Sequence, residues 1–292
     1  MTYSIVARDH TTGALGIAVQ SHFFGVGRLV TWASPGVGVV ATQAMVERAY
    51  GPRGLELMRR GQGAPEALAS LLADDADAGI RQVAMIDAAG RIGLHTGHHC
   101  VAAAGAATGD QVCALGNMLA DERCWDEMLV AYERATGPLT ERLLAALDAA
   151  EATGGDLRGR QSAALLVVSA EASDRPWEGV IADVRVDDSP EPLVELRRLA
   201  RYEAAYGLLG RALFEPTDGD RFDEALAGLE TAQEILGDNP EPTVWRGVLL
   251  ARAGRTGEAT RAFRLAADGR PHLAEFLRRL PAAGLLPPGC TI

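Results

Sequence analysis

The chain has 292 residues, 48% of them hydrophobic, enough for one large domain or two smaller ones with proper cores. Its net charge of −11 disfavours nonspecific binding to nucleic acid, and all 28 basic residues are arginine, which excludes chemistry that needs a lysine, such as a Schiff base or a P-loop. No apolar run could span a membrane and no signal peptide is visible, so we expect a cytoplasmic protein that does not bind membranes.

Alternating and continuous apolar runs predict strands in two groups, with helices between them. The expected strands, in chain order, are a hairpin within residues 1–21 and strands at 29–33, 37–42, 82–87, 91–95, 110–116, 163–170 and 180–186. The expected helices cover residues 55–60, a segment that opens at 64, and residues 121–135 and 139–153.

Helices that arrive in pairs between strand pairs do not fit the β-α-β alternation of a doubly wound sheet. They fit an α+β fold with two largely antiparallel sheets and a helix layer outside each, a four-layer αββα sandwich. Beyond residue 190 no strand pattern remains, and Glu224-Ala225 recurs 34 residues later as Glu258-Ala259. This period resembles that of tetratricopeptide repeats, so the sequence predicts domains at residues 1–190 and 191–292.

A hydroxyl residue, Thr2, directly follows Met1 at the head of the first predicted strand. Removal of Met1 would leave an N-terminal threonine, which is a nucleophile that its own α-amine can activate. Polar residues also gather at four places between apolar strands. They are Thr2 and Ser4 with residues 20–22, Gln43 after its strand, His95 to Cys100 with Asn117, and residues 155–162.

His95, His98, His99 and Cys100 are metal ligands by residue type, but their spacing is not a standard zinc pattern. We therefore interpret this stretch as a polar loop and expect no metal or cofactor; a metal-assisted hydrolase that uses His95, His99 and their neighbours is the alternative. The four cysteines show no C-x-x-C spacing and are expected to be reduced and mostly structural. No Gly-x-Ser-x-Gly motif is present, which disfavours an α/β-hydrolase.

Several motifs together resemble the DUF1028 family, a bacterial and archaeal family of uncertain function. They are Thr2-x-Ser4-Ile5-Val6-Ala7-Arg8-Asp9, Ala41-Thr42-Gln43, Tyr50-Gly51-Pro52-Arg53-Gly54, His95-Thr96-Gly97, Gly116-Asn117-Met118-Leu119 and Gly155-Asp156-x-Arg158-Gly159-x-Gln161-Ser162-Ala163. The resemblance covers roughly residues 1–190. It implies a fold similar to that of N-terminal nucleophile (Ntn) hydrolases, which cleave amides.

The resemblance implies a hydrolase of C–N bonds that acts on a small amide, lactam or ureido compound. Thr2 would be the nucleophile, with Ser4 as an alternative that needs cleavage after Tyr3. The implied catalytic set is Thr2, Ser4, Ser21, Gln43 and Asn117, and the implied substrate contacts are His22, His95, Arg158, Arg160 and Gln161. A non-catalytic ligand-binding or scaffold protein on the same fold is the alternative. The helical domain is expected to help assembly or to bind a protein partner, and a homo-oligomer is expected.

Overall fold

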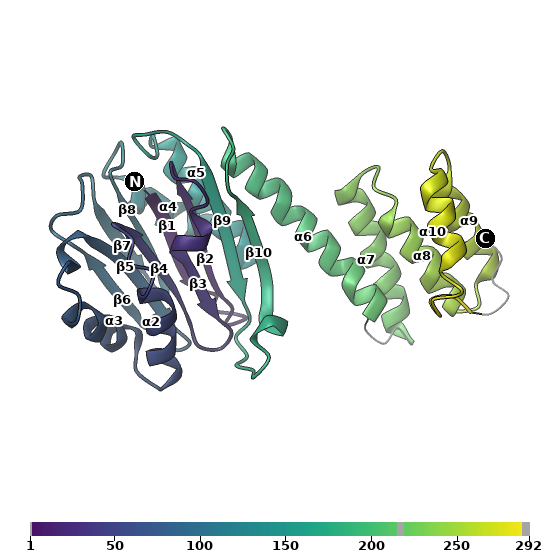
Figure 1. The fold of residues 1–292 in the computed structure, drawn as a ribbon, viewed down its shortest axis with the longest axis horizontal. Coiled ribbons are helices and arrows are strands. Elements are labelled where there is room, and N and C mark those ends of the chain that lie inside the picture. Colours follow the sequence, from purple (N-terminus) through teal and green to yellow (C-terminus); the bar gives the residue numbers. More distant parts are fainter. Residues whose placement is uncertain (1, 215–218, 288–292) are drawn as a thin grey trace. The chain divides into compact units, whose positions relative to one another are not determined.

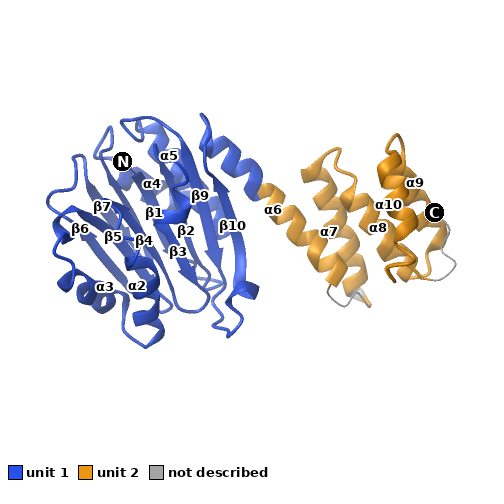
Figure 2. Cartoon of the chain, viewed as in Figure 1, with its two compact units in different colours: residues 1–200 blue, residues 201–292 orange. Residues whose placement is uncertain are grey.

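The computed structural model describes residues 2–214 and 219–287, and it divides into two compact units, residues 1–200 and 201–292 (Figures 1 and 2). Unit 1 contains both sheets and unit 2 is helical. Helix α6 (Pro192–Phe214) begins in unit 1 and ends in unit 2. The domain boundary that we placed at residue 190 stays a prediction.

Unit 1 contains two antiparallel sheets and two main pairs of helices. Its strands are β1 (Thr2–Arg8), β2 (Leu15–Ser21), β3 (Thr31–Ser34), β4 (Gly38–Ala44), β5 (Arg81–Asp87), β6 (Ile92–Thr96), β7 (Gly105–Gly109), β8 (Val112–Asn117), β9 (Ser162–Val168) and β10 (Val180–Val186). Its helices, with two short 3₁₀ turns, are α1 (Gly27–Val30), α2 (Tyr50–Arg59), α3 (Ala64–Ala73), η1 (Ala78–Ile80), α4 (Cys124–Arg134), α5 (Leu139–Ala152) and η2 (Pro176–Gly179).

The first sheet has six strands in the order β10-β9-β2-β1-β8-β7, and the second has four in the order β3-β4-β5-β6. All neighbouring pairs are antiparallel. Because successive side chains of a strand point to opposite faces of its sheet, each strand contacts a different layer on each side. This confirms the expected α+β class with two antiparallel sheets.

Strand β1 lies in the middle of the first sheet, and its side chains alternate between two buried layers. Tyr3 and Ile5 pack with Leu147 of α5 and the neighbouring side chains of α4. Val6 packs on the other face, against side chains of the second sheet such as Val39. Because both faces are buried, the middle of the strand is a continuous apolar run, Ile5-Val6-Ala7, rather than a polar–apolar alternation.

The second sheet buries its other face under α2 and α3. Val40 and Met85 pack there against Tyr50, Leu55 and Leu68. Pro65 stands in the first turn of α3, where its missing N–H costs nothing, and starts the helix as expected. The order of layers is therefore α4 and α5, the first sheet, the second sheet, and α2 and α3 (Figure 1).

Three elements of unit 1 differ from expectation. Helix α2 begins at Tyr50 rather than at Leu55. Leu29 and Val30 belong to the short helix α1 rather than to a strand, and the strand begins only at Thr31. Strand β7 was not predicted, because its sequence Gly-Ala-Ala-Thr-Gly has few β-branched or aromatic residues. Its pairing with β8 decides its conformation instead.

Unit 2 contains the end of α6 and the helices α7 (Asp220–Leu236), α8 (Glu241–Arg252), α9 (Thr256–Ala267) and α10 (Pro271–Arg279). Val248 of α8 and Phe263 of α9 are buried in one of its two cores. A Cβ atom on Gly247 would lie 2.5 Å from the Phe263 ring, so this glycine lets α8 and α9 approach closely. Among the residues that the structure describes, no helix has the length and apolarity needed to cross a membrane.

A matched pair of leucines tests the helix layer on the first sheet. The Leu147 side chain has 0% exposure and that of Leu157 has 65%. We expect Leu147→Ala to lower the free energy of unfolding by about 2–5 kcal/mol, because it leaves a cavity between α5 and β1. The control Leu157→Ala should change it by less than about 0.5 kcal/mol, as measured by urea denaturation. Equal effects of the two changes would contradict this packing.

Candidate functional site

The facing surfaces of the two sheets are apolar over most of their length and become polar at one end. Six polar side chains from β1, β2, β4, β5 and β8 replace the apolar ones there: Thr2, Ser4, Ser21, Gln43, Gln82 and Asn117. The register places Thr2 opposite Asn117 and Gln43 opposite Gln82. All six are buried, and Thr2, at 7% exposure, is the most accessible.

Gln82 is the centre of the hydrogen-bond network in this polar end. Its Oε1 accepts hydrogen bonds from Gln43 Nε2 at 2.8 Å and from Asn117 Nδ2 at 3.0 Å. Its Nε2 lies 2.8 Å from the carbonyl oxygen of Gly116 and 3.1 Å from Thr96 Oγ1. Gln82 therefore ties the second sheet to the first, and its amide orientation is fixed by donors on one side and acceptors on the other.

The hydroxyl groups of β1 and β2 occupy the edge of this network. Ser4 Oγ donates to Gln43 Oε1 at 2.5 Å, and Gln43 Nε2 lies 3.4 Å from the carbonyl oxygen of Thr2. Thr2 Oγ1 and Ser21 Oγ are 3.0 Å apart. Thr2 thus connects to the network through its main chain and to Ser21 through its side chain.

Thr2 and Ser21 also line a cavity of about 330 Å³. The remaining wall comes from apolar side chains within residues 23–46, from Met118 and from Arg158. Ala44 and Met118, which line it as well, have φ angles of 67° and 54°. Such left-handed backbone costs a non-glycine residue roughly 1–3 kcal/mol and tends to cluster at functional sites.

The turn after α5 brings Arg158 to this cavity. Gly154 and Gly155, with φ angles of 105° and 56°, end the helix in a conformation that suits glycine. Asp156 then pairs with Leu119, just beyond the end of β8. The buried Asp156 carboxylate accepts the backbone N–H of Arg158 at 2.9 Å and forms an ion pair with its guanidinium at 3.3 Å.

The family model for the "Family of unknown function (DUF1028)" matches residues 2–196. This chain belongs to the DUF1028 family. The crystal structure of protein SPO2555 from Silicibacter pomeroyi, which the same family model matches, is similar to the chain with a TM-score of 0.61 and 31% sequence identity. The similarity covers 77% of this chain and 93% of that protein. A search of curated proteins finds no match.

The polar end of the DUF1028 domain brings together all five residues that the sequence suggested as catalytic: Thr2, Ser4, Ser21, Gln43 and Asn117. Asn117 Oδ1 is buried and has no hydrogen-bond partner among the residues described. Because it lies on the strand opposite Thr2, this oxygen is an acceptor beside the head of β1. Their chemical roles stay predictions.

The five suggested substrate contacts separate into two groups. Arg158 lines the cavity, and the backbone N–H of His22 donates to Asp156 Oδ2 at 2.9 Å beside it. The other three do not line the cavity: His95 Nε2 contacts the Ala78 carbonyl oxygen, Arg160 pairs with Glu151 and Glu191, and Gln161 donates to Asp188.

Two residues of the DUF1028 site were missed by sequence reasoning. Gln82 was assigned only to a strand, although a polar residue at the start of an apolar run, like Gln43 at the end of another, was a usable signal. Asp156 was quoted within a motif, but nothing in the sequence indicated that its carboxylate is buried beneath Arg158.

The histidines and cysteines of the DUF1028 domain give no second site. The rings of His98 and His99 are 4.0 Å apart, yet in residues 2–214 and 219–287 no group of three or more His, Cys, Asp or Glu could hold a metal ion. Burial raises the pKa of Cys113 to about 12 and that of Cys124 to about 11, so both thiols stay protonated at neutral pH. Cys290 lies outside the described residues.

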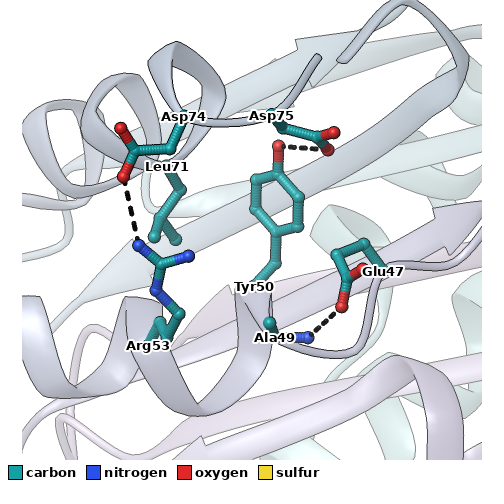
Figure 3. A pocket seen from close by; sticks show the side chains of 7 residues that line it. All are labelled: Glu47, Ala49, Tyr50, Arg53, Leu71, Asp74 and Asp75. Atoms are coloured by element: carbon teal, nitrogen blue, oxygen red, sulfur yellow. Dashed lines mark hydrogen bonds and ion pairs between the residues drawn. The ribbon is translucent and has the colours of Figure 1, made fainter. Parts of the chain in front are cut away.

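A second hollow, of about 220 Å³, lies at helices α2 and α3 (Figure 3). Tyr50 donates to Asp75 Oδ2 at 3.0 Å, and Arg53 donates to Asp74 at 3.2 Å. The hydrogen bond from Arg81 holds the pKa of Asp75 below its usual value, while burial raises that of Tyr50. These groups bond to one another between α2 and the segment after α3, which accounts for the shifts without a ligand.

Loss of the Gln82 amide tests the network. We expect Gln82→Met, which keeps the side-chain length, to lower the free energy of unfolding by about 3 kcal/mol or more, because it leaves buried amides and a carbonyl group unpaired. The exposed Gln62 offers a matched control, and Gln62→Met should cost less than about 0.5 kcal/mol in the same urea titration. A Gln82→Met protein as stable as the control would show that the network contributes nothing.

Proposed function

We propose that this chain is an amidohydrolase of the N-terminal nucleophile type, which cleaves a C–N bond in a small amide, lactam or ureido compound. The supporting observation is the position of the Thr2 hydroxyl, which adjoins Ser21 Oγ at 3.0 Å and lines a cavity of about 330 Å³. Once Met1 is removed, one residue supplies both the nucleophile and the base.

The reaction follows from these groups. The Thr2 α-amine takes the hydroxyl proton while Oγ1 forms a bond to the amide carbon, and the carbonyl oxygen becomes an oxyanion. The C–N bond then breaks, the leaving nitrogen takes the proton from the amine, and an ester to Thr2 remains. Water attacks this ester by the same base catalysis and releases the acid. Asn117 Oδ1, which is buried without a described hydrogen-bond partner on the strand opposite Thr2, is the acceptor that we propose for the amine.

The arrangement of layers supports kinship with the Ntn hydrolase fold. Two facing antiparallel sheets lie between two helix layers, and Thr2 begins a strand in the middle of the first sheet. In that fold the nucleophile stands at the start of the first strand. This similarity of fold makes amide hydrolysis a reasonable reaction to test. It does not by itself assign that reaction, because one fold serves many functions.

The helical region after residue 190 is proposed to be TPR-like and to bind a protein partner or a second copy of the chain. The repeated Glu-Ala pairs, 34 residues apart, lie on α7 and α9, each followed by another helix. Stacked helix pairs of this period provide extended surfaces for partners.

A ligand-binding protein without catalysis is the second candidate. The observation in its favour is that Gln43 and Asn117 each already donate one side-chain N–H to Gln82 Oε1. Fewer of their donors are then left for an oxyanion, and each missing donor costs roughly 3 kcal/mol of transition-state stabilisation. The two candidates differ in whether Thr2 reacts.

Substitution of Thr2 separates these candidates. We expect purified wild-type protein to lack Met1 by intact mass and to hydrolyse at least one member of a panel of small amides. Thr2→Ala should lower kcat by a factor of about 10³ or more, since it removes the nucleophile, and Thr2→Ser should retain activity. Thr108→Ala, on the exposed side of β7, is the control that should keep full activity. Retained Met1, or an active Thr2→Ala protein, would overturn the mechanism.

The pH dependence offers a separate test of the base. An α-amine has an ordinary pKa of about 7.7–8.0, and only its neutral form accepts the hydroxyl proton. We therefore expect kcat/KM to rise about tenfold per unit at acidic pH and to level off above about pH 8. Thr2→Ser, which keeps the amine, should show the same midpoint. A profile that does not depend on pH in this range would exclude the amine as the base.

A further inference from the structure

The cavity beside Thr2 is mostly apolar. Its walls include side chains of the loop after β2, of α1 and of the segment after β4: Phe23, Val26, Leu29, Val30, Met45 and Val46. Phe23 and Met45 are 50% and 54% exposed, so apolar surface extends from the cavity to solvent. Exposed apolar surface that continues into a cavity is typical of a site for an apolar ligand.

This wall is held in place before any ligand binds. Ser162 Oγ donates to the Phe23 carbonyl oxygen and accepts the backbone N–H of Val26 at 3.1 Å. Both bonds fix the loop between β2 and α1 to the start of β9. A preformed wall reduces the entropy lost on binding.

The size of the cavity limits the ligand. An apolar cavity of about 150 Å³ in another protein binds benzene, which has six non-hydrogen atoms. The cavity here is about 330 Å³. By proportion it accommodates roughly a dozen non-hydrogen atoms.

One cation faces this apolar space. Of the described side chains that line the cavity, only Arg158 carries a charge. Its ion-pair partner Asp156 has 0% side-chain exposure, whereas Arg158 keeps 39%. Asp156 also accepts the backbone N–H groups of His22 and Arg158, so its charge is shared among several donors and the guanidinium is not its sole compensation. A guanidinium in such a place recognises carboxylates.

We infer that the substrate is an amide with an apolar group and a carboxylate, as in an N-acyl amino acid, with the carboxylate at Arg158 and the apolar group against Phe23, Val30 and Met45. This inference rests on the proposed function and sharpens it, because a ureido compound or a small lactam would leave the apolar walls unused. N-hexanoylglycine, with a dozen non-hydrogen atoms, matches the cavity.

Binding to the Thr2→Ala protein tests the ligand class without catalysis. By calorimetry we expect N-hexanoylglycine to bind roughly tenfold or more tightly than N-acetylglycine, which lacks most of the apolar chain, and roughly ten- to hundredfold more tightly than the neutral N-hexanoylglycinamide. Adding Arg158→Met should remove the preference for the carboxylate. Arg123→Met is the matched control, because Arg123 also pairs with an aspartate two residues before it but lies on the surface.

Release of hexanoate and glycine by the wild-type protein is measured in parallel. The binding preferences together with release support both the ligand class and the hydrolase. The preferences without release support the ligand class and overturn the hydrolase. Equal binding of the charged and neutral compounds, or an unchanged preference in the Arg158→Met protein, overturns the ligand class, even where another amide is hydrolysed. No binding of any of the three compounds overturns it as well.

Discussion

The constraint on which this structure depends is the burial of six polar side chains between two sheets. A buried amide or hydroxyl without a partner costs about 1–3 kcal/mol, so these groups must satisfy one another. Gln82 makes most of these hydrogen bonds, and through them it joins Gln43 of its own sheet to Asn117 of the other. These three amides stand on β4, β5 and β8, and the register of these strands brings them within hydrogen-bond reach of one another. The same register sets Thr2 at the edge of the network, where the cavity begins.

Two residues in the wall of the cavity have a backbone conformation that lowers the stability of the fold. Ala44 directly follows Gln43 and Met118 directly follows Asn117, and both adopt left-handed φ angles. Each strand therefore turns sharply just after its network amide, and the turned residues form part of the cavity wall. A fold built for stability alone would place glycine at such positions. Ala44 and Met118 adopt this costly conformation beside Thr2, which is the pattern expected of a functional site.

The sequence predicted much of unit 1 because its strands carry strong apolar runs and its helices arrive in pairs. It failed where tertiary pairing decides the conformation, as in the Gly-Ala-rich β7. The resemblance to the DUF1028 family suggested Thr2, Ser4, Ser21, Gln43 and Asn117 together, and the structure brings them to one end of the two sheets, while their roles stay predictions. The sequence could not show that Arg158 lines the cavity and Arg160 does not. The conformation of the turn after α5 directs Arg158 to the cavity and Arg160 to Glu151. His95 lies away from the cavity because the register of β6 with β5 sets it opposite Val83, which packs under α2 and α3.

The central claim is that Thr2, which lines this cavity, reacts through its hydroxyl. A β-lactone with an apolar side chain tests it directly, because attack by a hydroxyl opens the ring and leaves a stable ester on the attacking oxygen. Intact mass and peptide mapping after incubation then locate the ester. We predict one adduct per chain, on residue 2 of protein that has lost Met1, and none on the Thr2→Ala protein. An adduct on another residue, or unmodified Thr2 in protein that lacks Met1, would contradict the account.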